Sequence, residues 1–124
     1  MLKPAGNPGI ESIAEIMKVM GETNRLHILQ LLSKQELCVC ELTALCHRSQ
    51  SNVSQHLFRL KSAGLVKERR NAQWIYYSLN EDNFPVIHDI LNLLPLDPLD
   101  LSSLETLKGR SSCLTINERC LVKK

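Results

Sequence analysis

The stretch SQSNVSQHLFRLKSAGLVKERRNAQWIYYSL, residues 49–79, joins a helical pattern to two strand patterns. Val53, Leu57 and Leu60 share one face at helical spacing, and Gly64 supplies a C-terminal stop. The runs LVKERR and WIYYSL are rich in β-forming residues, and the intervening NAQ indicates a turn. We therefore expect a helix followed directly by a β-hairpin.

Further helical segments surround this stretch, because apolar residues recur at helical spacing and Gly21 and Pro95 supply stops. Including the helix above, the expected helices cover about 10–20, 23–32, a short segment beginning near residue 40, 51–63 and 83–94. The order α-α-α-α-β-β-α predicts a mainly α winged helix-turn-helix. We expect residues 1–95 to form a DNA-binding domain of this type and residues 96–124 to form a weakly structured tail.

Length and composition limit the class of protein. A chain of 124 residues with 44% hydrophobic and 23% charged residues fits one domain with a real core. The N-terminus lacks the apolar segment of a secretory signal, and no apolar run approaches the roughly 18 residues of a membrane span. Five unevenly spread cysteines favour reduced thiols over a disulfide scaffold, so we expect a cytoplasmic protein with no membrane partner.

Positive charge is concentrated between His47 and Gln73. This segment holds six basic residues and one acidic residue, a net charge of +5, so the remainder carries −3 to reach the chain's +2. A local basic patch mounted on a helix and a hairpin is typical of a surface that binds phosphate. We therefore expect double-stranded DNA as the partner.

The candidate DNA-binding residues lie on the helix over 51–63 and on the hairpin. Polar side chains at the start of a recognition helix contact base edges in the major groove, whereas basic side chains further along contact phosphate. The expected base contacts are Gln50, Ser51, Asn52 and Gln55, with Ser54 and His56 beside them. The expected backbone or minor-groove contacts are Arg59, Lys61, Arg69, Arg70 and Gln73.

The segment ELCVCELTALC, Glu36–Cys46, places two cysteines one residue apart and a third six residues later. Cys38 and Cys40 lie near the start of a short helix, where the helix dipole favours the thiolate that binds soft ions. Cys46 falls on the apolar stripe of that helix, about 9 Å further along, and is interpreted as a core residue. The spacing therefore indicates two metal ligands rather than three.

Together, MKVMGETNRLHILQLL, ELCVCEL, SQSNVSQHLFRLKSAGLVKERR and QWIYYSLN resemble the ArsR/SmtB family of bacterial metal-responsive repressors, over about residues 10–94. The Cys-Val-Cys resembles the thiol site of the arsenic- and antimony-responsive branch. The resemblance implies a homodimer, formed through the first and last helices, that binds its operator when metal-free and is released by arsenite or antimonite. It implies neither an enzyme, nor an organic cofactor, nor a small organic substrate.

The source of a third thiol ligand is open. Arsenic-responsive relatives often carry it three residues after the second cysteine, where this chain has Thr43. Cys113 or Cys120 of the tail is a candidate, from the same or the opposite protomer, and both together would suit cadmium or lead. The alternative interpretation of the two tail cysteines is that they are incidental.

A conflict between two local structures is the expected switch. Residues i and i+2 diverge on a helix but lie on the same side of an extended segment, so chelation by Cys38 and Cys40 is expected to unwind the first helical turn. This would disturb the spacing of the two recognition helices. A repressor that senses oxidants through a disulfide between Cys38 and Cys40, or between Cys38 and Cys120, would look similar in sequence.

Overall fold

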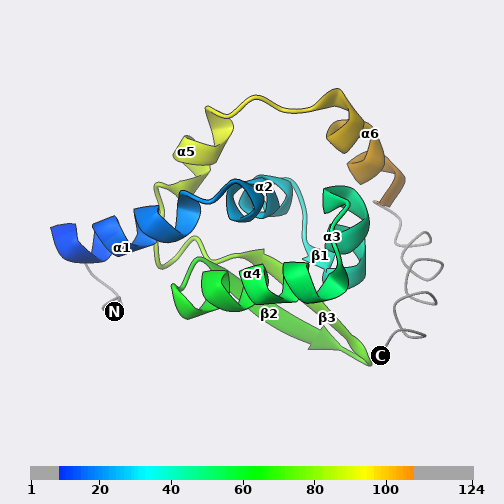
Figure 1. Ribbon diagram of the computed structural model, residues 1–124, viewed down its shortest axis with the longest axis horizontal. Helices are drawn as coiled ribbons and strands as arrows, with labels where there is room; N and C mark the ends of the chain where they lie inside the picture. Colours follow the sequence, from blue (N-terminus) through cyan, green and yellow to red (C-terminus); the bar gives the residue numbers. More distant parts are fainter. Residues whose placement is uncertain (1–8, 108–124) are drawn as a thin grey trace.

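The computed structural model describes residues 9–107 (Figure 1). Its elements, in chain order, are α1 (Ile10–Met20), α2 (Thr23–Leu32), β1 (Leu37–Cys38), α3 (Val39–Cys46), α4 (Gln50–Ser62), β2 (Val66–Asn71), β3 (Trp74–Leu79), α5 (Ile87–Asn92) and α6 (Pro98–Leu107). The predicted winged helix-turn-helix is confirmed: α3 and α4 form the helix-turn-helix, and β2 and β3 form the wing.

Side-chain caps fix where two of the helices begin. The Glu22 carboxylate accepts a hydrogen bond from the backbone N–H of Arg25 at 2.9 Å, at the start of α2. The Ser49 hydroxyl accepts one from the backbone N–H of Asn52 at 3.1 Å, at the start of α4. Each cap satisfies a backbone donor that the first turn leaves without a partner. The Ser49 cap therefore fixes the first turn of α4, the part of the helix predicted to contact DNA.

The wing belongs to a three-stranded antiparallel sheet in the order β1-β3-β2. The short strand β1 was not predicted; Cys38 pairs with Tyr76, and Leu37 with Tyr77. At the tip of the wing, Ala72 has a left-handed backbone with φ of 58°, which closes the hairpin turn. The sheet thereby fixes the start of α3 against the wing.

The C-terminal part of the described chain differs from expectation in two ways. Helix α5 has six residues rather than the span 83–94, because residues 81–83 and 85–86 form turns and the Asn83 side chain donates to the Gly64 carbonyl at 3.1 Å. Helix α6 forms where weak structure was expected. His27 Nε2 lies 2.8 Å from Asp100 Oδ2, and Leu104 enters the core, so α6 is anchored to the domain. The expected domain boundary at residue 95 remains a prediction.

A single main core lies between the helices and the inner face of the sheet. Most of its side chains are leucine and isoleucine from α1 to α5, joined by Leu37 of β1, Leu79 of β3 and Leu104 of α6. Burial of this apolar surface is the main driving force for assembling these elements. Within residues 9–107, the helices are too short and too polar for any of them to cross a membrane.

Candidate nucleic-acid interface and thiol cluster

Helix α4 has one buried face and one exposed face. Val53, Leu57 and Leu60 are buried in the core. The opposite face presents polar side chains to solvent, and the exposed members of the predicted DNA-binding set on this helix are Ser51, Ser54, Gln55, Arg59 and Lys61. Hydroxyl, amide and guanidinium groups on an exposed helix face are suited to base edges and phosphates.

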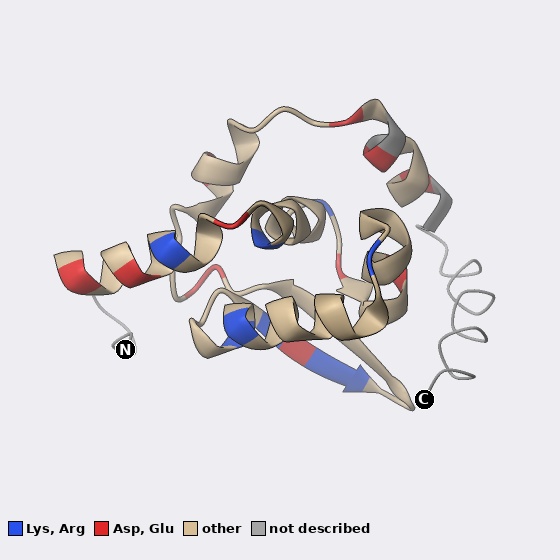
Figure 2. Cartoon of the chain, in the orientation of Figure 1, with Lys and Arg blue, Asp and Glu red and all other residues tan. Residues whose placement is uncertain are grey.

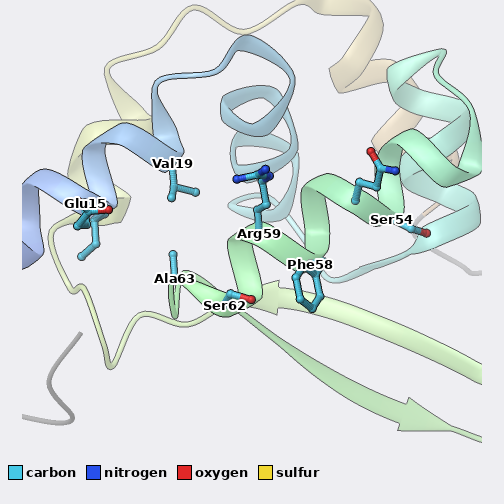
Figure 3. A pocket seen from close by; sticks show the side chains of 9 residues that line it. Glu15, Val19, Ser54, Phe58, Arg59, Ser62 and Ala63 are labelled. Carbon is cyan, nitrogen blue, oxygen red and sulfur yellow. The ribbon is translucent and has the colours of Figure 1, made fainter. Parts of the chain in front are cut away.

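Phe58 stands on the same exposed stripe, with 71% of its surface accessible. It lines a hollow of about 880 Å³ between α1 and α4, together with Glu15 and Val19 of α1 and Arg59 of α4 (Figure 3). Aromatic side chains contact the methyl group of thymine in some major-groove complexes. The exposed face of α4 therefore offers an apolar contact as well as polar ones.

Strand β2 of the wing carries basic residues on both sides of Glu68 in the sequence (Figure 2). Arg69, Arg70 and Gln73 are exposed, and their contact with the DNA backbone remains a prediction. Lys61 of α4 forms an ion pair with Glu68, and its hydrogen bond to that carboxylate raises the pKa of Lys61. This pair connects the end of α4 to the wing.

Arg69 is held on two sides. Its Nε and one terminal nitrogen donate to the two carboxylate oxygens of Glu36 at 3.0 and 2.7 Å, and these hydrogen bonds raise the pKa of Arg69. Its guanidinium also lies 5.1 Å from the centre of the Tyr76 ring, a cation–π distance. Both contacts fix the direction of an arginine on the wing.

Three residues of the predicted DNA-binding set are partly buried. Gln50 and Asn52 are half-buried at the start of α4. The His56 side chain is only 14% exposed and turns towards α2, where its ring nitrogens lie 3.4 Å from Arg25 and 3.9 Å from Glu22. This environment is that of a packing residue, and His56 is set apart from the exposed face.

Cys38 and Cys40 form a small cluster of their own at the start of α3. They are 3% and 6% exposed and share the cluster with Tyr76, which is 6% exposed, while Trp74 packs against its side. Cys38 has an extended backbone, with φ of −90° and ψ of 170°, and precedes the first helical residue. The two predicted ligands are therefore brought to one place between α3 and the wing.

A buried glutamate holds the first turn of α3 closed. Glu41 is fully buried, and its carboxylate accepts a hydrogen bond from the backbone N–H of Cys38 at 2.9 Å. Together with the reciprocal contact of the Cys38 side chain, this forms a capping box. Thr43 donates its hydroxyl proton to the Val39 carbonyl at 2.8 Å, within the same helix. The first turn is thus stabilised by Glu41, which pattern reasoning did not single out.

The predicted ligand set is only partly visible. Cys113 and Cys120 lie outside the described residues. Among residues 9–107, no group of three or more His, Cys, Asp or Glu side chains is arranged to hold a metal ion. Cys40 is disulfide-bonded whereas Cys38 and Cys46 are reduced, so the expectation of reduced thiols holds for only two of the three cysteines in the described part of the chain. The described chain therefore supplies two thiol positions and leaves the rest of the site open.

Cys46 lies apart from this cluster, at the other end of α3. It is half-buried and packs against the main core, as expected. Burial, together with the nearby Asp100 carboxylate, raises the pKa of the Cys46 thiol to about 11. A thiol that stays protonated at neutral pH is a poor ligand.

Sequence reasoning missed the aromatic side chains that enclose the thiols. Tyr76 and Trp74 alternate along β3 and share one face of it, a period-two signal that was visible in WIYYSL. Glu36 was also missed as a partner of Arg69. Their meeting with Cys38 depends on the pairing of β1 with β3, which joins residues far apart in the chain.

Known proteins with similar sequences point to a DNA-binding regulator. Residues 22–68 match the family described as bacterial regulatory protein, arsR family. The arsenic resistance transcriptional regulator ArsR2 of Pseudomonas putida is 40% identical over 72 residues, which are 58% of this chain and 63% of that protein. The chain thus spans less than two thirds of this relative's length.

Two further relatives are matched over more of their length. An uncharacterised HTH-type transcriptional regulator of Methanocaldococcus jannaschii is 36% identical over 68% of this chain and 92% of its own length. The transcriptional activator HlyU of Vibrio cholerae is 38% identical over 64% of this chain and 73% of its own. The structure of reduced HlyU superimposes with a TM-score of 0.62 over 68% of this chain and 85% of that chain, at 36% identity.

Proposed function

Because the chain belongs to the ArsR family of bacterial regulatory proteins, which are transcriptional regulators and not enzymes, we propose that it is a metalloid-responsive repressor. In this proposal it binds operator DNA in the metal-free state and is released by arsenite or antimonite. The observation that carries the proposal is the burial of Cys38 and Cys40 in one cluster, at the first turn of the helix that precedes α4.

The DNA-binding part of the proposal rests on the exposed face of α4 and on the wing. Ser51, Ser54 and Gln55 are exposed in the first half of α4, the half that enters the major groove in helix-turn-helix proteins. Arg59, Arg70 and the other exposed basic residues of α4 and the wing supply the positive charge for phosphate contacts. Specific recognition of a duplex needs both kinds of contact.

Exposed apolar side chains support a homodimer. Ile10 is 86% exposed and Met17 is exposed on α1, while Val86 and Leu93 are exposed at the two ends of α5. Clusters of exposed apolar residues commonly mark interfaces. A two-fold dimer through α1 and α5 would present two copies of α4 to half-sites about one DNA turn, roughly 34–36 Å, apart.

The thiol chemistry requires no change of oxidation state. Each cysteine S–H replaces one hydroxyl group of arsenous acid, As(OH)₃, and each replacement forms one As–S bond and releases one water molecule. Soft thiolates are the ligands that such ions prefer. Cys40 must be reduced for this reaction, so titrations require a reductant that is not itself a dithiol, such as a phosphine.

Chelation would strain the first turn of α3. Cys38 is extended whereas Val39 and Cys40 are helical, so side chains two residues apart diverge across this junction. Bringing both sulfur atoms onto one ion favours an extended Val39–Cys40 segment, which would break the capping box of Cys38 and Glu41. Binding of the ion would then disfavour the helical first turn of α3. In a repressor, such an opposition couples inducer binding to the loss of DNA affinity.

The test is release of a labelled duplex, selected from a random pool by the metal-free protein, as arsenite, antimonite, cadmium, lead and zinc are added in parallel. We expect arsenite and antimonite to weaken binding by about 5- to 150-fold. Cys38→Ser with Cys40→Ser should bind the duplex normally and show no release. Cys113→Ser with Cys120→Ser shows whether the tail supplies a ligand.

Two results of this release assay would contradict the proposal. One is release of the double Cys38→Ser, Cys40→Ser variant at the same arsenite concentration as the unaltered protein. The other is strong release by zinc alone, which would indicate a site of different chemistry. The absence of salt-sensitive duplex binding would remove the DNA-binding function itself.

The disulfide at Cys40 favours one second candidate, a repressor of the same fold that responds to thiol oxidation. Oxidation of a thiol at the start of α3 would act on the same cluster without an ion. In this case peroxide would release the duplex in the presence of a chelator, and reductant would restore binding. A protein that responds to arsenite but not to peroxide is the metalloid sensor.

A further inference from the structure

The sheet places a thiol, an aromatic ring and a wing arginine in one row. Cys38 of β1 pairs with Tyr76 of β3, and Tyr76 pairs with Arg69 of β2. Residues directly opposite each other in antiparallel strands project to the same face of the sheet. The three side chains are therefore cross-strand neighbours, and Tyr76 stands between the other two.

Each step of this row is a physical contact. Tyr76 is buried in the same cluster as Cys38 and Cys40, and the Arg69 guanidinium lies 5.1 Å from the centre of its ring. A second link runs through the chain itself, since Glu36, two residues before Cys38, holds Arg69 with hydrogen bonds of 2.7 and 3.0 Å. The wing arginine is thus tied to the thiol segment by a ring and by a carboxylate.

We propose that Tyr76 is a positioning residue that transmits occupation of the thiol site to Arg69, so that the wing, and not only the recognition helix, reports the inducer. This inference rests on the proposed function and deepens it. The cluster is closely packed, so an ion bound by Cys38 and Cys40 displaces the neighbouring ring. Movement of the ring, and of Glu36 directly before β1, then alters the direction of Arg69 and weakens its contact with DNA.

The opposite face of β3 provides a matched control. Tyr77 follows Tyr76 directly but pairs with Leu37 and packs against the main core. Removing its ring therefore perturbs the same strand without interrupting the row from Cys38 to Arg69. Tyr76→Phe is a second control, because the contacts with the cluster and with the guanidinium use the ring.

The experiment measures duplex affinity with and without arsenite for the unaltered protein, Tyr76→Leu, Tyr76→Phe and Tyr77→Leu. Arsenite binding is followed separately by fluorescence of Trp74, the chain's single tryptophan, which packs against the thiol cluster. In Tyr76→Leu we expect arsenite still to bind, but its effect on duplex affinity to fall from 5- to 150-fold to within about 3-fold. Tyr76→Phe and Tyr77→Leu should keep the full effect.

Arg69→Lys tests the other end of the row and does not depend on the folding of Tyr76→Leu. It keeps the charge but loses the two-nitrogen fork and the stacking on Tyr76, so the arsenite effect should fall as well. The double variant Tyr76→Leu, Arg69→Lys should lose little more of the arsenite effect than Arg69→Lys alone, because both substitutions remove the same contact between the ring and the guanidinium.

Equal release by arsenite in the unaltered protein, Tyr76→Leu and Arg69→Lys would overturn the role of Tyr76 while leaving the repressor proposal intact. Loss of the arsenite effect in Tyr77→Leu, equal to that in Tyr76→Leu, would also overturn it, by showing a general effect of destabilising the strand. If the unaltered protein neither binds nor responds to arsenite, the proposed function itself fails.

Discussion

The two ends of helix α3 carry cysteines in opposite surroundings. At the N-terminal end, Cys38 and Cys40 are enclosed by the aromatic side chains of β3. At the C-terminal end, Cys46 packs against the main core, and burial with the nearby Asp100 carboxylate raises the pKa of its thiol to about 11. The positive end of the helix dipole favours a thiolate, whereas the negative end does not. Residues of one type, within nine positions of each other, therefore have different chemistry.

The largest effect expected from this comparison is on the response to arsenite. Cys40→Ser should abolish release of the duplex, a loss of the entire 5- to 150-fold effect, because one ligand is missing. Cys46→Ser should keep release within about 3-fold of the unaltered protein, because a protonated thiol at the far end of α3 is no ligand. Titration of the labelled duplex with arsenite checks both, and equal responses would remove the distinction between the ends.

The pH dependence of stability gives the next largest effect. The folded pKa of Cys46 lies above its ordinary value of 9.0, so the protonated thiol stabilises the fold below pH 9, and this contribution is lost as pH rises through about 11. The loss is at most roughly 3 kcal/mol. Urea denaturation at pH 8 to 11 should show a steeper decline for the unaltered protein than for Cys46→Ala. Parallel declines would exclude Cys46 as the cause.

A smaller effect is expected at the N-terminal cap. Glu41→Ala removes the acceptor of the buried Cys38 N–H and should lower the free energy of unfolding by about 2 kcal/mol. Glu41→Gln keeps an acceptor at the same place and should cost much less. Thermal or urea denaturation measures both variants. Equal losses would show that the capping hydrogen bond is not what Glu41 contributes.

The smallest expected effect is at the C-terminal cap. His47 has a left-handed backbone, with φ of 55°, directly after Cys46. Glycine adopts this conformation without steric cost, so His47→Gly should raise stability by about 0.5 kcal/mol. Denaturation curves of His47→Gly and His47→Ala test this. Both variants lose the histidine ring, but only glycine adopts the left-handed backbone without steric cost. A decrease in stability with glycine would show that the histidine ring itself contributes.

Local patterns in the sequence were sufficient for most of the fold. The spacing of Val53, Leu57 and Leu60 placed α4, and the runs around NAQ placed the wing. These features depend on residues close to one another, where helix periodicity and turn chemistry act. The position of Cys38 and Cys40 at the start of α3 could be predicted for the same reason, because the two cysteines and the helical pattern are close together in the sequence.

The parts that were missed depend on contacts between distant residues. The pairing of Cys38 with Tyr76 joins positions 38 residues apart, so no local pattern indicates β1 or the ring over the thiols. The inward turn of His56 depends on Arg25 of α2 and on Glu22, which caps that helix. Likewise, α6 is held by Asp100 and Leu104 against distant elements. Tertiary contacts of this kind override local preference.

The two edge strands of the sheet affect how readily the protein aggregates. One edge is β1, with only two residues, and the other is β2, whose exposed side chains include Lys67, Arg69 and Arg70. Short edge strands and edge charges prevent sheets of different molecules from joining into aggregates. The basic residues that the proposed repressor uses for DNA thus also protect the free protein from self-association. Variants that neutralise the wing to abolish DNA binding would therefore also be expected to aggregate more readily.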